Sequence, residues 1–230
     1  MLREWLYPPK CCGCKKLIEG GTHLCPRCKK ELIRVKDPIC LCCGKTVKEE
    51  GASLCYDCRK NPHGFVNNRS LYQYNEAASR LMYELKYGHN RDVAEFFGKE
   101  MAMQFRGYIH GLRVDGIVPI PLHKKRKRQR GYNQAELIAK EIGKKCKVPV
   151  YPDFLERVRL TRPQKELNDA GRKNNVKNAF QLGKNELQLN KILLVDDIYT
   201  TGATIDAAVR TLFEAGVQEV YGLTVCVGRG

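Results

Sequence analysis

Two adjacent carboxylates, Asp196 and Asp197, come directly after four apolar residues, Ile192 to Val195. Such an unbroken apolar run predicts a strand that is buried on both faces, as in a parallel sheet. The carboxylates are then expected at the end of the strand, where open α/β sheets bind ligands. Carboxylate oxygens bind divalent cations and accept hydrogen bonds from sugar hydroxyls, whereas they repel phosphate. The pair is therefore a candidate site for a ribose or a divalent metal ion.

The segment after the two acids has the composition of an anion-binding loop. It combines small and hydroxyl-bearing residues with one glycine: Ile198, Tyr199, Thr200, Thr201, Gly202, Ala203 and Thr204. A helix is predicted over 205–214, and the unpaired N–H groups at a helix start bind phosphate. Gly202 allows the backbone to come close to such a group. A purely structural threonine-capped turn is the alternative, but the ordered run of strand, acid pair and loop favours a phosphate site.

A strongly basic run follows a second apolar strand, which is predicted over 116–122. Six of the seven residues after His123 are basic: Lys124, Lys125, Arg126, Lys127, Arg128 and Arg130. Like charges in a turn are usually a solvated face. Their position after a strand end, where a second cluster for phosphate groups would lie, favours anion binding instead. The same six residues are candidates for contacts with the phosphates of nucleic acid.

A long polar segment, residues 157–178, separates two predicted elements. Its length argues for a lid over a site rather than a plain connection. The residues expected to contact a ligand are Thr161, Arg162, Gln164, Arg172 and Asn175.

Ten of the twelve cysteines lie between Cys11 and Cys58. They form two copies of one pattern, in which two Cys-x2-Cys pairs are separated by ten residues in the first copy and eleven in the second. Four cysteines at this spacing form a closed tetrahedral zinc site, so we expect two structural Zn²⁺ ions. The predicted ligands are Cys11, Cys14, Cys25, Cys28, Cys40, Cys43, Cys55 and Cys58.

The cysteine pattern leaves some alternatives open. The pairs combine either within or across the repeats, and Cys12 is able to replace Cys11. No role follows for Cys42. A disulfide framework is the less favoured alternative, because the chain shows no secretion signal.

The whole chain favours a polyanionic partner. Its formal charge is +16, from 41 basic and 25 acidic residues, which suits nucleic acid. No apolar run approaches the roughly 18 residues that a membrane span requires, and the first residues lack the features of a signal peptide. We therefore expect a cytoplasmic protein without a membrane span.

The predicted domains are a double zinc ribbon over 1–60, a linker over 61–70 and an α/β domain over 71–230. Asn133 is the expected cap of a helix that ends near Gly143, with Glu136 as its capping-box partner. Lys86 and Tyr87, before Gly88, are expected nearer the site than the rest of their helix. The other predicted elements are strands over 69–74 and 219–227 and helices over 77–87 and 93–105.

The acid pair and the loop after it resemble the phosphoribosyl-pyrophosphate (PRPP) loop of type I phosphoribosyltransferases. Three motifs together resemble the ComF family: the cysteine pairs, the Pro119–His123 segment with Arg130–Gln134, and the acid-pair loop. The resemblance covers almost the whole chain. It implies a mostly parallel sheet with helices on both faces, preceded by a small zinc-ribbon domain.

The resemblance also implies a function. Asp196 and Asp197 would bind the ribose of PRPP together with Mg²⁺, and the loop after them the 5′-phosphate. Pro121, Leu122, His123 and Lys124 would form the pyrophosphate loop. The implied role is the handling of single-stranded DNA in natural competence, beside the helicase-like protein ComFA, with recruitment to the inner face of the membrane at the DNA-uptake machinery.

The sequence leaves two classes of function open. One is a phosphoribosyltransferase, and no residue specifies its acceptor. The other is a nucleic-acid-binding module that turns nothing over. Tyr132 and Tyr199 are the nearest stacking candidates beside the basic residues.

Overall fold

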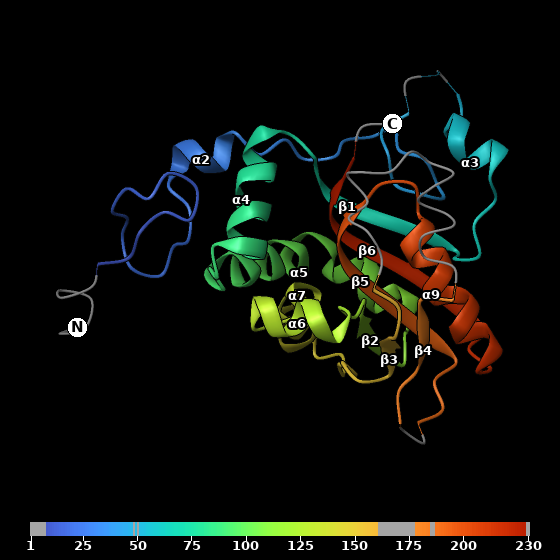
Figure 1. Ribbon diagram of the computed structural model, residues 1–230. Helices are drawn as coiled ribbons and strands as arrows, with labels where there is room; N and C mark the ends of the chain where they lie inside the picture. The colour runs from blue at the N-terminus through green and yellow to red at the C-terminus, as the bar shows by residue number, and fades with distance from the viewer. Residues whose placement is uncertain (1–7, 48, 50, 161–177, 185–186, 229–230) are drawn as a thin grey trace.

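A four-stranded parallel sheet lies at the centre of the molecule (Figure 1). The computed structural model describes residues 8–47, 49, 51–160, 178–184 and 187–228. The strand order is β1-β6-β5-β2. The strands are β1 (Asn67–Gln73), β2 (Gly116–Pro119), β5 (Lys191–Tyr199) and β6 (Glu219–Val227). The predicted α/β class is confirmed.

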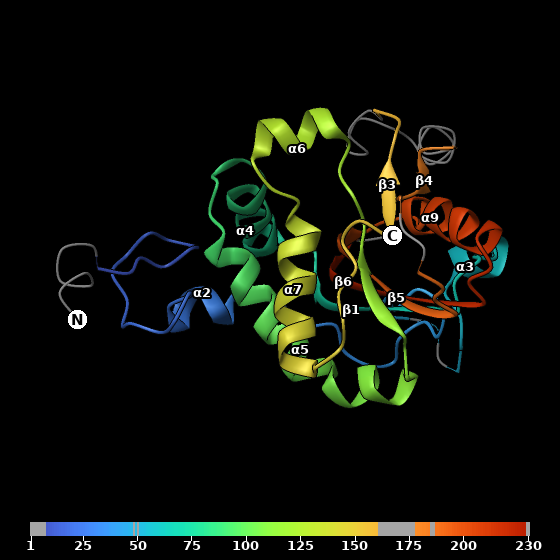
Figure 2. The same ribbon diagram turned by 90° about the horizontal axis from the view of Figure 1, so that it is seen from below.

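Helices cover both faces of the sheet, as Figures 1 and 2 show. On one face lie α4 (Glu76–Tyr87), α5 (Asp92–Leu112) and α7 (Gln134–Cys146), which share a core with Leu193 and Val195 of β5. On the other face α9 (Ala203–Glu214) packs with Ile192 and Leu194 of the same strand. Because β5 is buried from both sides, it contains the unbroken apolar run Ile192 to Val195.

Shorter elements complete the described fold. They are α2 (Pro26–Lys30), α3 (Tyr56–Lys60), α6 (Lys124–Arg130), β3 (Leu155–Arg157) and β4 (Phe180–Leu182). Strands β3 and β4 form an antiparallel pair. The predicted lid falls between them, and its residues Thr161, Arg162, Gln164, Arg172 and Asn175 lie outside the described part of the chain.

The structure corrects several predicted boundaries. Strand β5 does not end at Val195 but continues through the acid pair to Tyr199, because β6 pairs with it along that whole length. Its other neighbour, β2, ends at Pro119, opposite Val195. The acids therefore project beyond the end of β2, which opens the crevice that we expected at a strand end. Strand β1 begins at Asn67, so residues 67–70 of the predicted linker lie in the sheet.

The basic run forms a helix and not a turn. His123 caps α6 through a hydrogen bond that its side chain accepts from the backbone N–H of Lys125. Gly131 ends the helix with φ 79°, a left-handed conformation that favours glycine. Asn133 caps α7 as predicted, but Glu136 forms ion pairs with Lys127 and Lys140 instead of a capping box.

The two zinc ribbons lie on opposite sides of the molecule (Figures 1 and 2). Residues of the first ribbon, including Cys11 and Leu24, belong to the core of α4 and α5, whereas Cys40 and Val47 of the second belong to the core of α9. Between the ribbons, the backbone N–H of Val35 donates to the carbonyl of Leu71 in β1, so this segment covers the edge of the sheet. Each ribbon thus depends on the body for part of its apolar contacts.

None of the helices in the described ranges has the length and apolar character that crossing a lipid bilayer requires.

Candidate functional site

A cavity of about 300 Å³ opens at the carboxyl ends of the strands. Its wall contains both acids of the pair, Thr200 and Thr204 of the following loop, and residues from α4, α6, α7 and β3. Four basic side chains line it: Lys86, Arg126, Arg130 and Arg157. The cavity therefore combines two carboxylates with a cationic wall, which suits a ligand that carries both hydroxyl and phosphate groups.

Asp197 is held in an ion-paired network. Its Oδ2 lies 2.7 Å from Nζ of Lys86 and accepts a hydrogen bond of 2.9 Å from Nε2 of Gln134. Arg130 donates in turn to Oε1 of Gln134. Burial disfavours the ionised carboxylate, but the charge and hydrogen bond of Lys86 and the hydrogen bond of Gln134 outweigh burial, so the pKa of Asp197 lies below its ordinary value.

Asp196 has a different environment. Burial, reinforced by the negative charge of Asp197, raises the pKa of Asp196 to about 7. Its Oδ1 accepts a hydrogen bond of 2.8 Å from the backbone N–H of Asp197. One acid is therefore charged at neutral pH, and the other lies close to its midpoint. A divalent cation or ribose hydroxyls at this position would favour the ionised form of Asp196.

The loop after the acids has the geometry of an anion cradle. Gly202 has φ 79° and precedes the first residue of α9, so the first backbone N–H groups of that helix lie at the recess lined by Thr200 and Thr204. A Cβ atom at Gly202 would lie 2.6 Å from the hydroxyl of Tyr199, so only glycine fits. Among the described residues, Oγ1 of Thr201 in the same loop is buried without a hydrogen-bond partner.

Tyr199 lies at this recess, but its side chain packs against other residues. Its side chain is buried, and its hydroxyl lies 3.2 Å from Nε2 of His63. Its ring meets that of Phe65 edge to face. Tyr199 thus connects the loop to the second ribbon, and it cannot stack on a nucleic-acid base. The same correction applies to Tyr132, which is buried and donates to the carbonyl of Leu85.

The predicted pyrophosphate loop reaches the cavity only in part. Pro121 and Leu122 line it, whereas His123 caps α6 and Lys124 lies exposed in the first turn of that helix. The missing positive charge comes instead from Lys86, Arg126, Arg130 and Arg157. The position of Lys86 before Gly88 predicted that it lies near the site. Gln134 lies in the Arg130–Gln134 motif and Arg157 begins the predicted lid segment, but the sequence assigned neither side chain a role in the site.

Each predicted set of four cysteines forms one cluster. The sulfur atoms of Cys11, Cys14, Cys25 and Cys28 all lie within 4.8 Å of one another, as do those of Cys40, Cys43, Cys55 and Cys58. Tetrahedral zinc with Zn–S bonds of about 2.3 Å requires sulfur atoms about 3.8 Å apart. The Cys14–Cys25 distance is 3.8 Å and the Cys43–Cys55 distance is 3.6 Å. The pairs thus combine within each repeat, and both clusters fit structural zinc.

In each cluster the local backbone favours the thiolate form of one cysteine, whereas burial raises the pKa of Cys28, Cys43 and Cys58. Burial opposes ionisation of Cys11, but N–H groups of Cys25, Cys14 and Gly13 outweigh it and lower the pKa of Cys11 to about 6. The equivalent Cys40 behaves in the same way, with a pKa of about 7. Backbone N–H groups that donate to a thiolate in this way commonly orient and stabilise it as a metal ligand.

The spare thiols lie outside both clusters. All twelve cysteines are free of disulfide bonds, so that alternative is wrong for this structure. Cys12 is buried against α4 and α5, and burial raises its pKa to about 11. Cys42 lies near Cys58 and His63, and burial raises its pKa above the ordinary value. Neither thiol replaces a predicted ligand.

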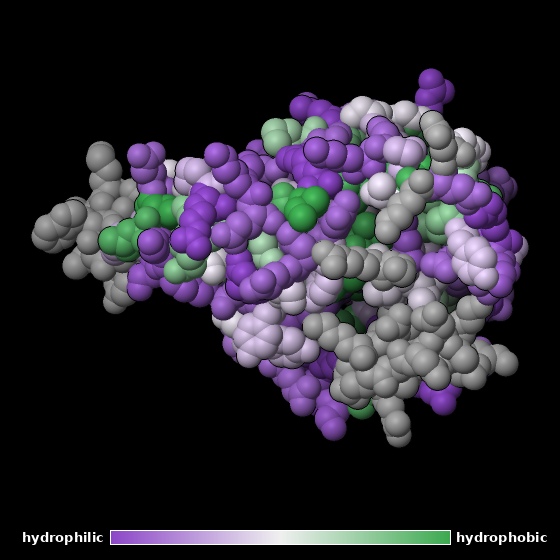
Figure 3. All heavy atoms as spheres, turned by 90° about the horizontal axis from the view of Figure 1, so that it is seen from above, coloured by the Kyte–Doolittle hydropathy of each residue, from purple (hydrophilic) through white to green (hydrophobic). Residues whose placement is uncertain are grey.

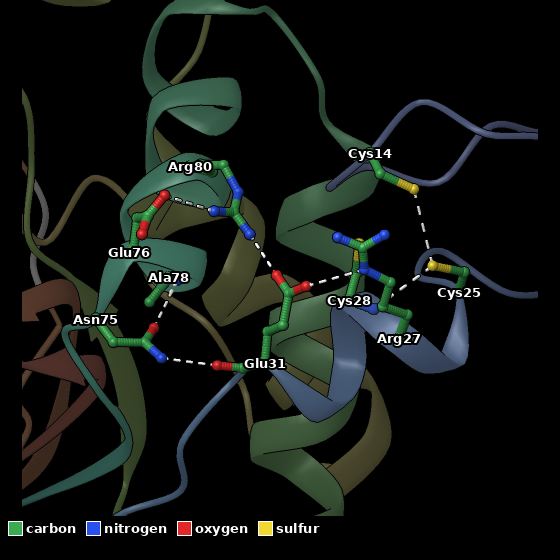
Figure 4. Close-up of polar contacts among 9 residues, drawn as sticks. All are labelled: Cys14, Cys25, Arg27, Cys28, Glu31, Asn75, Glu76, Ala78 and Arg80. Carbon is green, nitrogen blue, oxygen red and sulfur yellow. Dashed lines mark hydrogen bonds and ion pairs between the residues drawn. The ribbon is translucent and has the colours of Figure 1, made fainter.

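The first ribbon is fastened to α4, as Figure 4 shows. Asn75 caps α4 by accepting from the N–H of Ala78, and its Nδ2 donates to the carbonyl of Glu31 at 2.7 Å. The Glu31 carboxylate pairs with both Arg27 and Arg80. The ribbon thereby supports the helix that carries Lys86 into the cavity.

The second ribbon is fastened to β1 and to the loop before it. The backbone N–H of Asn68 donates to the carbonyl of Cys42 at 2.6 Å, and its Nδ2 donates to that of Cys43 at 3.1 Å. His63, just after this ribbon, lies against Tyr199 beneath the anion cradle. Each ribbon is thus attached to a different wall of the candidate site.

The sequence of this chain is similar to those of known proteins. Residues 2–59 match the family model of the double zinc ribbon domain. Competence protein F of Haemophilus influenzae is 29% identical, in an alignment that covers 92% of this chain and 93% of that protein. Competence protein ComFC of Bacillus subtilis is 26% identical, over 87% of this chain and 82% of that protein.

Over almost its whole length, the chain is therefore similar to ComF proteins. DNA utilization protein YhgH of Escherichia coli is a further relative, 26% identical over 95% of this chain and 97% of that protein. The similarity to ComF proteins therefore extends through the sheet and the cavity and is not confined to the ribbons.

Proposed function

We propose that this protein binds PRPP with Mg²⁺ in the cavity at the sheet edge. The observation that carries the proposal is the position of Asp196 and Asp197 between an anion cradle and a wall of four basic side chains. PRPP presents ribose hydroxyls between a 5′-phosphate and a pyrophosphate, so it matches that order of groups. Residues 71–230 would form the phosphoribosyltransferase-like unit, and the ribbons would brace it.

Each part of the ligand has a proposed partner. Asp196 and Asp197 would accept hydrogen bonds from the ribose hydroxyls, and Asp196 would offer oxygen to Mg²⁺. The N–H groups from Thr200 to Thr204 would bind the 5′-phosphate. Arg126, Arg130 and Arg157 would lie nearest the pyrophosphate, and bound Mg²⁺ would neutralise part of its charge. The lid candidates between β3 and β4 would close over it.

The reaction that such a site supports is phosphoribosyl transfer. An acceptor nucleophile would form a bond to C1 of the ribose while the bond from C1 to pyrophosphate breaks. The pyrophosphate leaves with its electron pair, so the basic side chains that line the cavity would stabilise the charge that develops on it. Closure of the cavity would exclude water as a competing nucleophile.

We further propose that the protein handles single-stranded DNA during natural competence. The names of its relatives support this, since two are competence proteins and one is a DNA utilization protein. In α6, Lys124, Lys125 and Arg128 are exposed and form no ion pair with the described residues. In the first ribbon, by contrast, Lys29 pairs with Glu100, and Lys15 with Glu84.

The proposed setting follows from the family. The protein would act beside the helicase-like ComFA, at the inner face of the membrane where DNA enters. Its strongly basic surface, with a formal charge of +16, would favour both incoming DNA and an anionic membrane face. Hydrophilic side chains cover much of the described surface in Figure 3, in keeping with attachment through a partner or through charge.

Calorimetric titration of the zinc-loaded protein with PRPP, with and without Mg²⁺, tests the proposal. We expect metal-dependent binding in wild type and its loss in D196N/D197N. Zinc content should stay at the wild-type value in this variant, because neither acid contacts a cysteine cluster. Binding that survives in the variant would contradict the site assignment. An absence of binding in wild type would favour the nucleic-acid-binding module without PRPP.

A further inference from the structure

Two tyrosines on α4 form an exposed aromatic surface at the rim of the cavity. Tyr83 and Tyr87 are 63% and 62% exposed, although α4 buries its opposite side in the core. They lie one helical turn apart, and their ring centroids are 5.2 Å from each other, with the planes tilted by 45°. An exposed tyrosine alone is ordinary, but two adjacent rings provide an apolar surface large enough for a base to stack on.

This aromatic surface is continuous with the basic helix α6. The guanidinium carbon of Arg130, at the end of α6, lies 5.6 Å from the ring centroid of Tyr87. Nδ1 of His89, just after α4, lies 3.2 Å from the carbonyl oxygen of Arg130 and joins the two helices. Exposed lysines and arginines beside exposed aromatic rings are the combination that binds single-stranded nucleic acid, through phosphates and stacked bases respectively.

The same surface borders the candidate PRPP site. Both rings line the cavity that contains Asp196 and Asp197. Lys86, between the two tyrosines in sequence, reaches inward to Asp197. Arg130 also contributes to both places, since it lies over Tyr87 and donates to Gln134 in the network of Asp197. A base on the two rings would therefore lie at the mouth of the cavity.

We propose that Tyr83 and Tyr87 are the stacking platform for single-stranded DNA, with the strand's phosphates along α6. The platform rests on the proposed handling of DNA but not on PRPP binding. A base pair in a duplex keeps its faces stacked within the helix, so the platform requires an unpaired strand. Because DNA and PRPP are both anions and share Arg130, bound PRPP should weaken DNA binding, and the effect should be reciprocal.

Fluorescence anisotropy with a short labelled oligothymidylate tests the platform on the zinc-loaded full chain. Y83A/Y87A should weaken binding by about tenfold or more, because stacking contributes substantially for each base. Y83F/Y87F keeps both rings and should bind like wild type. The salt dependence of Y83A/Y87A should equal that of wild type, because no phosphate contact is removed.

Tyr56 is the matched control. It is 61% exposed and lies under Nζ of Lys60 at 4.5 Å, but it belongs to α3 in the second ribbon, far from α4 (Figure 1). Y56A should bind DNA like wild type. An equal loss in Y56A would overturn the proposal, as would wild-type affinity in Y83A/Y87A. Binding of duplex as tightly as single strands would also overturn it.

A PRPP titration of the same variants separates this inference from the PRPP proposal. If the wild-type protein does not bind PRPP, and Y83A/Y87A binds DNA more weakly than wild type, the platform stands and the PRPP assignment fails. If PRPP binds and the tyrosine variants bind DNA normally, the platform fails alone. If saturating PRPP leaves the DNA affinity of wild type unchanged, DNA and PRPP do not share Arg130.

Discussion

Nδ1 of His63 lies 2.8 Å from Oδ2 of Asp206 in α9, and this contact joins the segment just after the second zinc ribbon to the helix that follows the anion cradle. The other ring nitrogen faces the Tyr199 hydroxyl, and the imidazole stacks on Phe65 with centroids 4.7 Å apart. A Cβ at Gly202 would lie 2.7 Å from Cε1 of the same imidazole. His63 thus sets the position of the loop from behind, and it does not line the cavity.

Replacement of this imidazole should weaken the cradle. In H63A we expect PRPP affinity to fall by about tenfold, equivalent to about 1.4 kcal/mol, because the loop loses the contact that fixes Tyr199 and Asp206. Calorimetric titration measures the change. H110A is a matched control, because His110 is exposed near the end of α5, and it should leave affinity unchanged. Equal affinities in both variants would show that the loop holds its shape without His63.

The ion pair between Lys86 and Asp197 should contribute strongly to stability. K86M leaves a buried carboxylate without its cation, so we expect the free energy of unfolding to fall by about 3 kcal/mol or more. Urea denaturation of the zinc-loaded protein measures this. K86M/D197N lacks the unpaired Asp197 carboxylate, so part of the lost free energy of unfolding should be recovered. A double variant as unstable as the sum of both single variants would contradict an interaction between the two groups.

Stability should depend on pH through Asp196. Its pKa is raised to about 7 by burial, so between its ordinary value and 7 the folded state binds a proton that the unfolded state has released. The free energy of unfolding therefore falls as pH rises through this range, and the contribution is constant above it. D196N removes the effect, so its free energy of unfolding relative to wild type should rise by about 1.4 kcal/mol between pH 6 and pH 8.

Urea unfolding without Mg²⁺ at both pH values provides this comparison. The control is D153N, which replaces an exposed acid outside the cavity and should keep the pH dependence of wild type. If the stability difference between wild type and D196N stays constant with pH, the pKa of Asp196 is not raised.

The two zinc sites should respond separately to substitution. C25S and C55S each remove one of four ligands, so each should lose one of two equivalents of zinc while the other site keeps its metal. C12S and C42S should keep both equivalents, because these thiols are outside the clusters. Metal analysis of the purified variants provides the measurement. Loss of both zinc ions from C25S would mean that the ribbons fold as one unit.

The charge of α6 should govern the salt dependence of DNA binding. K124S/K125S removes two exposed cations, so the slope of log affinity against log salt should become shallower by about 1.4 for a single strand. K144S/K145S removes two exposed cations at the end of α7, away from α6 (Figure 2), and should leave the slope unchanged. DNA titrations of both variants at several salt concentrations measure the two slopes. If only K144S/K145S reduces the salt slope, the bound DNA strand does not lie along α6.

Local signals in the sequence predicted much of this structure. The apolar run before Asp196 predicted the central strand, and the spacing of cysteines such as Cys11 and Cys14 predicted both metal clusters. Strand β6 has the predicted bounds, Glu219–Val227. These features succeed because strand burial and metal geometry are properties of short segments.

Tertiary contacts explain what the sequence could not predict. The pairing of Lys86 with Asp197 joins α4 to β5, and no periodic pattern connects the two. The sequence predicts Tyr199 in the cradle, but tertiary packing turns its side chain toward His63. The run of like charges in α6 gave no reason to expect a helix, which depends on the caps at His123 and Gly131.

The position of β6 constrains the order in which the chain can fold during synthesis. It follows β1, β2 and β5 in sequence, yet it lies between β1 and β5 in the sheet. A ribosome must therefore produce residues 219–227 before β1 can join the other strands, while the cysteine ribbons are complete much earlier. Until then β1 and β5 expose unpaired edges that are prone to aggregation. Early zinc loading would leave fewer unfolded segments on the nascent chain during that wait.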